Sequence, residues 1–302
     1  MSGFDLHLHS THSDGKLSVP EIALIVKNNK LSYCALADHN SVAGIQKLMV
    51  ALEDSGIIVI PATELTAKYN DNEIHILAYD FNINLAAEII KERNEIVRSQ
   101  KIEEMKAAIK LSREAGLKVT DGLNSCEKQP VSLTIALDIC ANIVNQKFFI
   151  KKFGKQLTPE DVYYEYQAPG KSCAVKRSGV TVEWLKQKFK GIAQDLIIAH
   201  PFVSVSVVTK PLNESEINNL IKLGLTGVEV YHNHTTNEQI DLLKRIVEKQ
   251  SLHYTGGSDS HGKETDTPIG QYGPASFVTS FYLTNYKSSL KNQSKYAQRS
   301  IN

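Results

Sequence analysis

The first fourteen residues contain three side chains that could bind a metal ion. Phe4 to His9 has the pattern of a short strand in which His7 and His9 stand two positions apart. Residues i and i+2 of a strand point to the same face, so these two imidazoles can reach one cation. Asp14 follows in a Ser-Asp-Gly turn and offers a hard oxygen ligand. A lone His-x-His pair is more often a surface feature, so the assignment depends on further ligands elsewhere in the chain.

Further residues of metal-ligand type stand in or after predicted strands throughout the chain. They are His39, Glu64, His75, His200, Asp259 and His261. His75 lies within its strand, and the others follow strand ends. In barrels of parallel strands the carboxyl ends meet at one face, so we expect all nine side chains to lie close together. Six of the ten histidines belong to this set, which makes it far more specific than any single member.

These nine residues indicate hydrolysis of a phosphate ester. Nine ligands exceed the needs of one tetrahedral zinc and suit two or three divalent ions, with Glu64 as a bridge. Imidazoles mixed with carboxylates fit manganese, zinc or iron. Such ions lower the pKa of bound water and stabilise the attacking and leaving oxygens of an in-line displacement. The residues predicted to take part directly in catalysis are His7, His9, Asp14, Glu64, His200, Asp259 and His261.

Alternating strands and helices are predicted to position these ligands. A capping box at Ser18 to Glu21, with a proline in the first turn, opens the first helix. Nearly continuous apolar strands between helices favour a parallel sheet with helices outside. The predicted strands are 4–9, 33–37, 57–62, 73–79, 195–199, 226–230 and 252–255, and the helices between them are 18–30, 42–54, 182–190, 213–223 and 237–249.

The strand and helix rhythm is interrupted between residues 93 and 179. A long polar helix is predicted over 84–115, followed by an apolar helix over 133–144 and a basic stretch over 147–155. We predict an α/β barrel made of 1–92 and 180–302, with 93–179 as an inserted, mostly helical subdomain. The tail after Tyr286 is polar and predicted to be peripheral.

Composition excludes several classes of protein. A chain of 302 residues with 42% hydrophobic residues can bury a large core, and a net charge of +1 gives no overall attraction to nucleic acid or membranes. Cys34, Cys126, Cys140 and Cys173 form no C-x-x-C pair. With no signal-peptide pattern and no apolar run of about 18 residues, we expect reduced thiols, a cytoplasmic location and no membrane segment. No obligate protein partner is inferred.

Several sequence blocks resemble the PHP (polymerase and histidinol phosphatase) phosphoesterases. The blocks, in the family's order, are Asp5-Leu-His-Leu-His-Ser10, Ser13-Asp-Gly15, Ala37-Asp-His-Asn40, Thr63-Glu64, His75, Ala199-His-Pro201 and Gly257-Ser-Asp-Ser-His261. The resemblance covers most of 4–92 and 192–272. It implies a distorted seven-stranded (β/α)7 TIM-like barrel with a trinuclear metal centre. It is closest to the branch of nucleoside 3',5'-bisphosphate phosphatases and 5'-3' exoribonucleases, which also carries a helical insertion acting as a substrate cap.

The resemblance also implies how the ligands are grouped. The implied groups are His7, His9, Glu64 and Asp259 for one ion, Glu64, His75 and His200 for a second, and Asp14, His39 and His261 for a third. One departure from the family is that the insertion normally carries an Arg-His pair for substrate phosphate, where this chain has Leu133 and Thr134. We therefore predict either that phosphate is bound by Arg93 or Arg177, or that the substrate differs from that of the family branch. His232 is a further candidate for contacting the substrate or acting as a general acid.

The predicted substrate is a nucleotide phosphate monoester or short RNA. Three alternative functions are also considered. A small-molecule phosphatase such as histidinol phosphatase would use the same residues. An amidohydrolase would need a lysine at a strand end, and no predicted strand ends in lysine. A non-catalytic, metal-stabilised nucleic-acid-binding module is favoured only by the departure at Leu133. Among neighbouring residues, we expect Asp38 to orient an imidazole and His253 to be structural.

Overall fold

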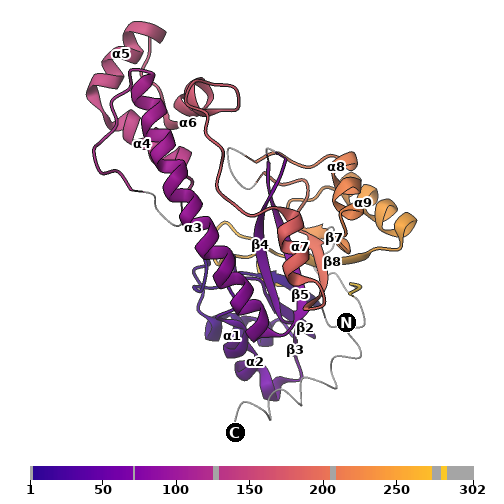
Figure 1. Cartoon of the computed structure of the whole chain (residues 1–302). Helices are drawn as coiled ribbons and strands as arrows, with labels where there is room; N and C mark the ends of the chain where they lie inside the picture. Colours follow the sequence, from indigo (N-terminus) through magenta and orange to yellow (C-terminus); the bar gives the residue numbers. More distant parts are fainter. Residues whose placement is uncertain (1–2, 71, 125–128, 205–208, 274–279, 284–302) are drawn as a thin grey trace. The chain divides into compact units, whose positions relative to one another are not determined.

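The computed structural model divides the chain into two compact units (Figure 1). Unit 1 comprises Met1–Lys91 with Thr181–Asn302, and unit 2 comprises Glu92–Val180. The structure describes residues 3–70, 72–124, 129–204, 209–273 and 280–283. Cys126 and the tail after Tyr286 lie outside these residues.

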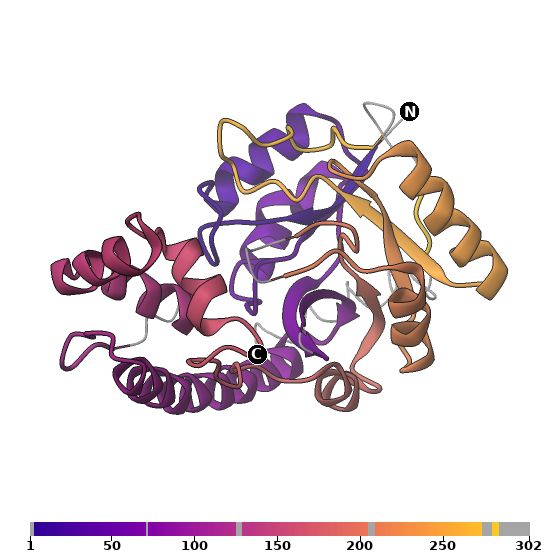
Figure 2. The ribbon, with the colours of Figure 1, turned by 90° about the horizontal axis from the view of Figure 1, so that it is seen from above.

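Unit 1 begins with a three-stranded parallel sheet of order β1-β2-β3. Its strands and the elements between them are β1 (Phe4–Leu8), α1 (Val19–Asn28), β2 (Tyr33–Leu36), α2 (Ile45–Leu52), the 3-10 turn η1 (Glu53–Ser55) and β3 (Ile58–Val59). The predicted capping box at Ser18 is present. Gly56 ends η1 with φ +72°, a backbone conformation that glycine adopts without steric cost. Helices α1 and α2 cover the outer face of this sheet (Figure 2).

A second sheet has five strands in the order β4-β5-β6-β7-β8. The strands are β4 (Ala62–Tyr69), β5 (Asn72–Phe81), β6 (Ala193–Ile198), β7 (Gly227–His232) and β8 (His253–Gly257), and the helices preceding the last three are α7 (Val182–Phe189), α8 (Glu214–Lys222) and α9 (Asn237–Gln250). Strands β6, β7 and β8 are parallel, as predicted. Strand β5 runs antiparallel to both of its neighbours.

The antiparallel β5 corrects the prediction of a wholly parallel sheet. The sequence assignment ended one strand at Ala62, whereas β4 begins there and continues to Tyr69. Only two residues link β4 to β5, and a connection this short can join only antiparallel strands. His75 therefore lies in the first half of β5, beside the carboxyl end of β6, where the Ala199 N–H donates to the His75 carbonyl at 3.1 Å.

The predicted closed barrel of seven strands is not confirmed. The described residues form eight strands in sheets of three and five, and these sheets do not close into one barrel. Single bridges connect their edges, Leu8 with Ser260 and His39 with Glu64. Each bridge lies beside predicted metal ligands. The edges between the sheets therefore bring distant parts of the sequence to one place.

The core of unit 1 lies between and behind the two sheets. One apolar cluster includes Leu6, Leu77, Tyr79 and Ile197, all fully buried. The Tyr79 hydroxyl donates to the Leu6 carbonyl at 2.7 Å, so this buried phenol is satisfied and joins β5 to β1. This packing fixes the strands on which the candidate ligands stand.

Unit 2 is helical. It contains the part of α3 (Ile83–Glu114) from Glu92 onward, followed by α4 (Val131–Ala141), α5 (Ile143–Phe153), α6 (Pro159–Val162) and the π turn η2 (Tyr163–Gln167). The long helix predicted over 84–115 is confirmed by α3. The apolar helix predicted over 133–144 is present as α4, which ends at Ala141, and most of the predicted basic stretch forms a second helix, α5. Asn142 has an extended backbone, and its side chain accepts from the Val144 N–H to begin α5.

No single helix in the described parts of the chain has both the length and the apolar composition of a membrane span. Helices α4 and α5 satisfy that test only when joined, and the pair is bent by 86°.

Candidate metal centre

The structure brings all nine predicted ligands together in unit 1. Ligand atoms of eight of them form three overlapping sets, and within each set the atoms lie within 4.8 Å of one another, whereas the ninth residue, His200, contacts Glu64. The sets are His7, His9, Glu64 and Asp259; His39, Glu64 and His75; and His9, Asp14, His39 and His261. The first set has the composition that the family resemblance implies. The second contains His39 where His200 was expected, although His200 also contacts Glu64.

The first set is the most buried. His7 and His9 project from the same face at the end of β1, as the two-residue spacing predicts. The Nε2 atoms of both histidines lie 3.3 Å from Glu64 Oε2. The same atoms also lie near Asp259 Oδ1, at 3.5 Å for His7 and 3.0 Å for His9. Two imidazoles and two carboxylates thus face one point.

Glu64 lies at the centre of the whole cluster. It is the third residue of β4, not a residue after a strand end as predicted. Its Oε1 lies 2.8 Å from His75 Nδ1 and 2.9 Å from His200 Nε2, and its Oε2 lies 3.1 Å from His39 Nδ1. One carboxylate therefore contacts imidazoles from all three sets, which is the position that a bridging ligand requires.

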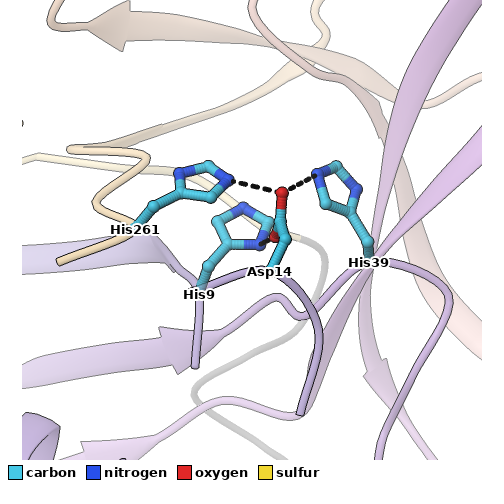
Figure 3. Close-up of side chains that lie close together, drawn as sticks. All are labelled: His9, Asp14, His39 and His261. Carbon is cyan, nitrogen blue, oxygen red and sulfur yellow. Dashed lines mark ion pairs between the residues drawn. The ribbon is translucent and has the colours of Figure 1, made fainter. Parts of the chain in front are cut away.

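The third set is closer to solvent. Asp14 lies between His261 and His39 (Figure 3), with its Oδ2 at 3.3 Å from His261 Nε2 and 3.9 Å from His39 Nε2. Half of the Asp14 side chain is exposed, whereas His7 and His9 are fully buried. The centre is therefore open on the side of Asp14.

The loop that carries Asp14 is fixed by Asp38. The Asp38 carboxylate accepts from the Ser10 N–H at 2.8 Å, from the Ser10 hydroxyl at 2.8 Å and from the Ser13 hydroxyl at 2.6 Å. The prediction that Asp38 orients an imidazole is therefore wrong. The three hydrogen bonds of its carboxylate show that it positions the turn leading to Asp14.

Glu229 is a member of the site that sequence reasoning missed. It is fully buried in the middle of β7. It accepts from His7 Nδ1 at 2.9 Å and from the His200 backbone N–H at 2.8 Å. The available signal was a charged residue inside the otherwise apolar run Gly227-Val-Glu-Val. A buried glutamate without a partner is costly, so its presence there indicated a partner.

The three predicted substrate-binding residues have different surroundings. His232 is fully buried as the last residue of β7, and its Nε2 lies 3.4 Å from Asp259 Oδ2. Arg93 is a buried residue of α3 whose Nη1 donates to Asn94 Oδ1 at 2.9 Å, and Arg177 is half-buried. Both arginines belong to unit 2, and their role in binding phosphate stays a prediction.

Electrostatics in the most buried set favour positive charge on His7 and His9 and negative charge on Glu64. Burial acts to lower the pKa of His7, but Glu229, Asp259 and Glu64 outweigh it and raise that pKa well above its usual value. Against the same effect of burial, Asp259 and Glu64 raise the pKa of His9 to about 9. Burial would raise the pKa of Glu64, but the surrounding histidines hold it well below the usual range.

Several buried atoms at the centre make no hydrogen bond and match the requirements of a metal ion. Among the described residues, six buried atoms of the cluster make no hydrogen bond: His7 Nε2, both ring nitrogens of His9, His39 Nδ1, Glu64 Oε2 and Asp259 Oδ1. Buried polar atoms without partners are rare and need an explanation. All six are ligand atoms suited to a divalent cation. The residues present therefore fit a metal centre.

Two of the ligand residues have a strained backbone. His200 has φ +23° and Asp259 has φ +52°, values in the region that non-glycine residues seldom occupy. Such conformations cost free energy and persist where surrounding contacts hold them, often at functional sites. The local fold therefore holds these two side chains in place at the expense of backbone strain.

Comparison with known proteins supports this interpretation. The profile of the PHP domain matches residues 5–194, more than half of the chain. A 5'-3' exoribonuclease of Haemophilus influenzae is 25% identical over 262 residues, covering 85% of this chain and 89% of the relative. A 3',5'-nucleoside bisphosphate phosphatase of Chromobacterium violaceum is 23% identical over 269 residues, covering 86% and 88%.

The fold is similar to that of a solved structure. A crystal structure from Bifidobacterium adolescentis, of a protein described as a metal-dependent phosphoesterase, superimposes with a TM-score of 0.59 at 20% identity. The alignment covers 92% of this chain and 93% of the other. The likeness to this structure shows the shared fold, and the match to the PHP domain over more than half of the chain shows that the chain belongs to the PHP domain family.

Proposed function

We propose that this phosphoric ester hydrolase removes phosphate from a nucleotide, such as a nucleoside 3',5'-bisphosphate, or degrades short RNA. The observation that carries the proposal is the convergence of nine imidazoles and carboxylates in one cluster, with Glu64 at its centre. The names of two relatives, a 5'-3' exoribonuclease and a 3',5'-nucleoside bisphosphate phosphatase, support the substrate class. The proposed cofactors are two or three divalent ions of manganese, zinc or iron.

The proposed ligand roles follow from the contacts. His7, His9, Glu64 and Asp259 would hold the most buried ion, and Asp14 would complete the outermost set with His9, His39 and His261. Glu64, near His39, His75 and His200, would join the sets. Bound divalent cations would supply Lewis acidity and a water molecule of lowered pKa.

Access to the centre suggests where the substrate lies. Asp14 is half-exposed and His39 is 24% exposed, whereas His7 is fully buried. A phosphate group would therefore approach on the side of Asp14 and His39. His232 is buried and faces Asp259, so we propose that it orients this carboxylate and that another group protonates the leaving oxygen.

The test is phosphate release by the manganese-loaded protein. The substrates are a nucleoside 3',5'-bisphosphate, a short 5'-phosphorylated oligoribonucleotide and histidinol phosphate. We expect release from one or both of the first two, and loss of at least 100-fold in Asp259→Asn. Turnover of histidinol phosphate alone would instead identify a small-molecule phosphatase, and no release from any substrate with metal bound would refute the proposal.

A matched control is available in the same sheet. Asp195 is also a fully buried carboxylate, on β6, and it pairs with His253 and accepts from the Thr226 hydroxyl. It belongs to none of the three ligand sets. Asp195→Asn should lose stability without the specific loss of activity expected for Asp259→Asn.

The non-catalytic alternative makes a different prediction. A vestigial centre would be expected to lack ligands, and the described residues supply all nine, with His200 next to Glu64. Binding of RNA without turnover, unchanged by His7→Ala, would favour that alternative.

A further inference from the structure

Glu229 has surroundings that a residue of purely structural function does not need. Its side chain is fully buried in β7, between Val228 and Val230, which are also buried. A buried carboxylate is costly unless hydrogen bonds compensate for the lost water, and an apolar side chain would fill the same strand position without that cost. Its contacts therefore indicate what the charge does.

The first contact of Glu229 fixes the ring of His7. Nδ1 of His7 donates to Glu229 Oε1 at 2.9 Å. With its proton on Nδ1, the ring presents Nε2 to the opposite side, where Glu64 Oε2 lies at 3.3 Å and Asp259 Oδ1 at 3.5 Å. A carboxylate that holds one nitrogen of an imidazole fixes the tautomer and leaves the other nitrogen free to bind a metal.

The second contact of Glu229 fixes the backbone of another ligand. The His200 N–H donates to Glu229 Oε2 at 2.8 Å, and His200 has the unusual φ of +23°. The same residue directs its Nε2 to Glu64 Oε1 at 2.9 Å. One carboxylate thus holds a ring from β1 and a strained backbone after β6, two segments far apart in the sequence.

We propose that Glu229 is a positioning residue that sets the affinity of the centre for metal by holding His7 and His200 together. The inference rests on the proposed metal centre and assigns Glu229 no contact with substrate. Removing the charge should leave both histidines present but less well oriented. The effect should therefore be seen in metal binding itself, before any reaction is measured.

The experiment compares Mn²⁺ binding by the full-length wild-type protein, Glu229→Gln and Asp195→Asn, using calorimetric titration of the metal-free proteins. Glutamine has the same shape, but its amide nitrogen cannot accept a hydrogen bond, so at least one of the two contacts is lost. We expect Glu229→Gln to weaken the tightest Mn²⁺ site by about 10- to 100-fold, the usual range for a residue that orients a metal ligand. Asp195→Asn should keep wild-type affinity.

A thermal melt of each metal-free variant separates positioning from general destabilisation. If Glu229 were only structural, both variants would melt earlier and both would keep wild-type Mn²⁺ affinity. An affinity of Glu229→Gln within twofold of wild type would therefore overturn the inference. In the zinc-loaded protein, the hydrogen-bonded Nδ1 proton of His7 should also give an NMR signal that Glu229→Gln removes.

Misfolding of Glu229→Gln and failure of the wild-type protein to bind Mn²⁺ would each lead to a definite conclusion. If Glu229→Gln does not fold, Glu229→Asp decides the question, because its shorter carboxylate keeps the charge but cannot reach both partners. Affinity within twofold of wild type in that variant overturns the inference in the same way. Failure of the wild-type protein to bind Mn²⁺ would refute the proposed metal centre, and the inference with it, whereas normal wild-type binding with no effect at Glu229 would refute the inference alone.

Discussion

Protonation of individual histidines makes metal binding and stability depend on pH. Relative to the ordinary value of 6.5, the pKa values of His7 and His200 are raised, and that of His9 is raised to about 9. Metal binding requires neutral imidazoles, so a bound ion displaces these protons. The protein without metal and the protein with metal should therefore respond differently to alkali.

The metal-free protein should lose stability as the pH rises from about 6.5 to 9. Over this range the folded state holds protons on His7, His9 and His200 that the unfolded chain has lost, so the free energy of unfolding falls with pH. The pKa of His39, lowered by burial to about 3, acts in the opposite direction but only below 6.5. Calorimetric melting temperatures at several pH values would test this. A metal-free protein that becomes more stable across the range would contradict it.

Residue spacing in the sequence predicted which residues are ligands, but it did not predict which residues surround and position them. The alternation of strand side chains placed His7 and His9 on one face, and the structure agrees. Asp38 and Glu229 were not assigned correctly because their roles depend on partners far away in the sequence. Asp38 binds Ser10 and Ser13, and Glu229 binds His7, 222 positions away. No local pattern encodes such pairs.

At the scale of elements, the packing of β1 against the end of β8 depends on Gly257. A Cβ atom at this position would lie 2.3 Å from His7 Cβ and 2.6 Å from His7 N, far inside contact distance. Gly257→Ala should therefore push β1 away from β8, destabilise the protein by about 1–3 kcal/mol and weaken metal binding. Chemical unfolding and Mn²⁺ titration would measure the two effects. Wild-type values for both would show that the strands adjust without cost.

Unit 2 has a comparable dependence on one polar side chain. Asn145 of α5 is buried, donates to the carbonyls of Lys118 and Ile139, and accepts from the Lys118 N–H. Asn145→Ala removes three hydrogen bonds and should destabilise unit 2 by about 1–3 kcal/mol. Urea unfolding would measure the loss, with the exposed neighbour Lys147→Ala as a control that should change stability little. Equal stabilities for the two variants would refute this role of Asn145.

Elements were predicted where their patterns were local. Helix α3 was recognised from its long polar sequence, and α1 from its capping box. The β4–β5 hairpin was missed because the run Ala62 to Tyr69 includes Thr, Glu and Lys and has no helix after it. The closed barrel was expected from the family resemblance. Whether a sheet closes depends on hydrogen bonds between its edge strands, and the spacing of residues along the sequence does not reveal these bonds.

At the scale of the whole molecule, metal should contribute strongly to stability. The centre places several buried carboxylates and imidazoles together, and a ligand that binds only the folded state stabilises it by mass action. Removal of metal by a chelator should therefore lower the melting temperature, and added Mn²⁺ should restore it. A His7→Ala, Asp259→Asn double variant should show a much smaller response to Mn²⁺. An equal response in wild type and double variant would place the stabilising ion elsewhere.

The bridge between Leu8 and Ser260 has a consequence for biosynthesis. A ribosome adds some 250 residues between His9 and Asp259, so His7 and His9 are made long before Asp259 and His261. A growing chain therefore carries six of the nine chelating groups once His75 has been made, well before the last three are added. The protein can acquire its full complement of ions only after Asp259 and His261 have been made, when the two distant segments meet.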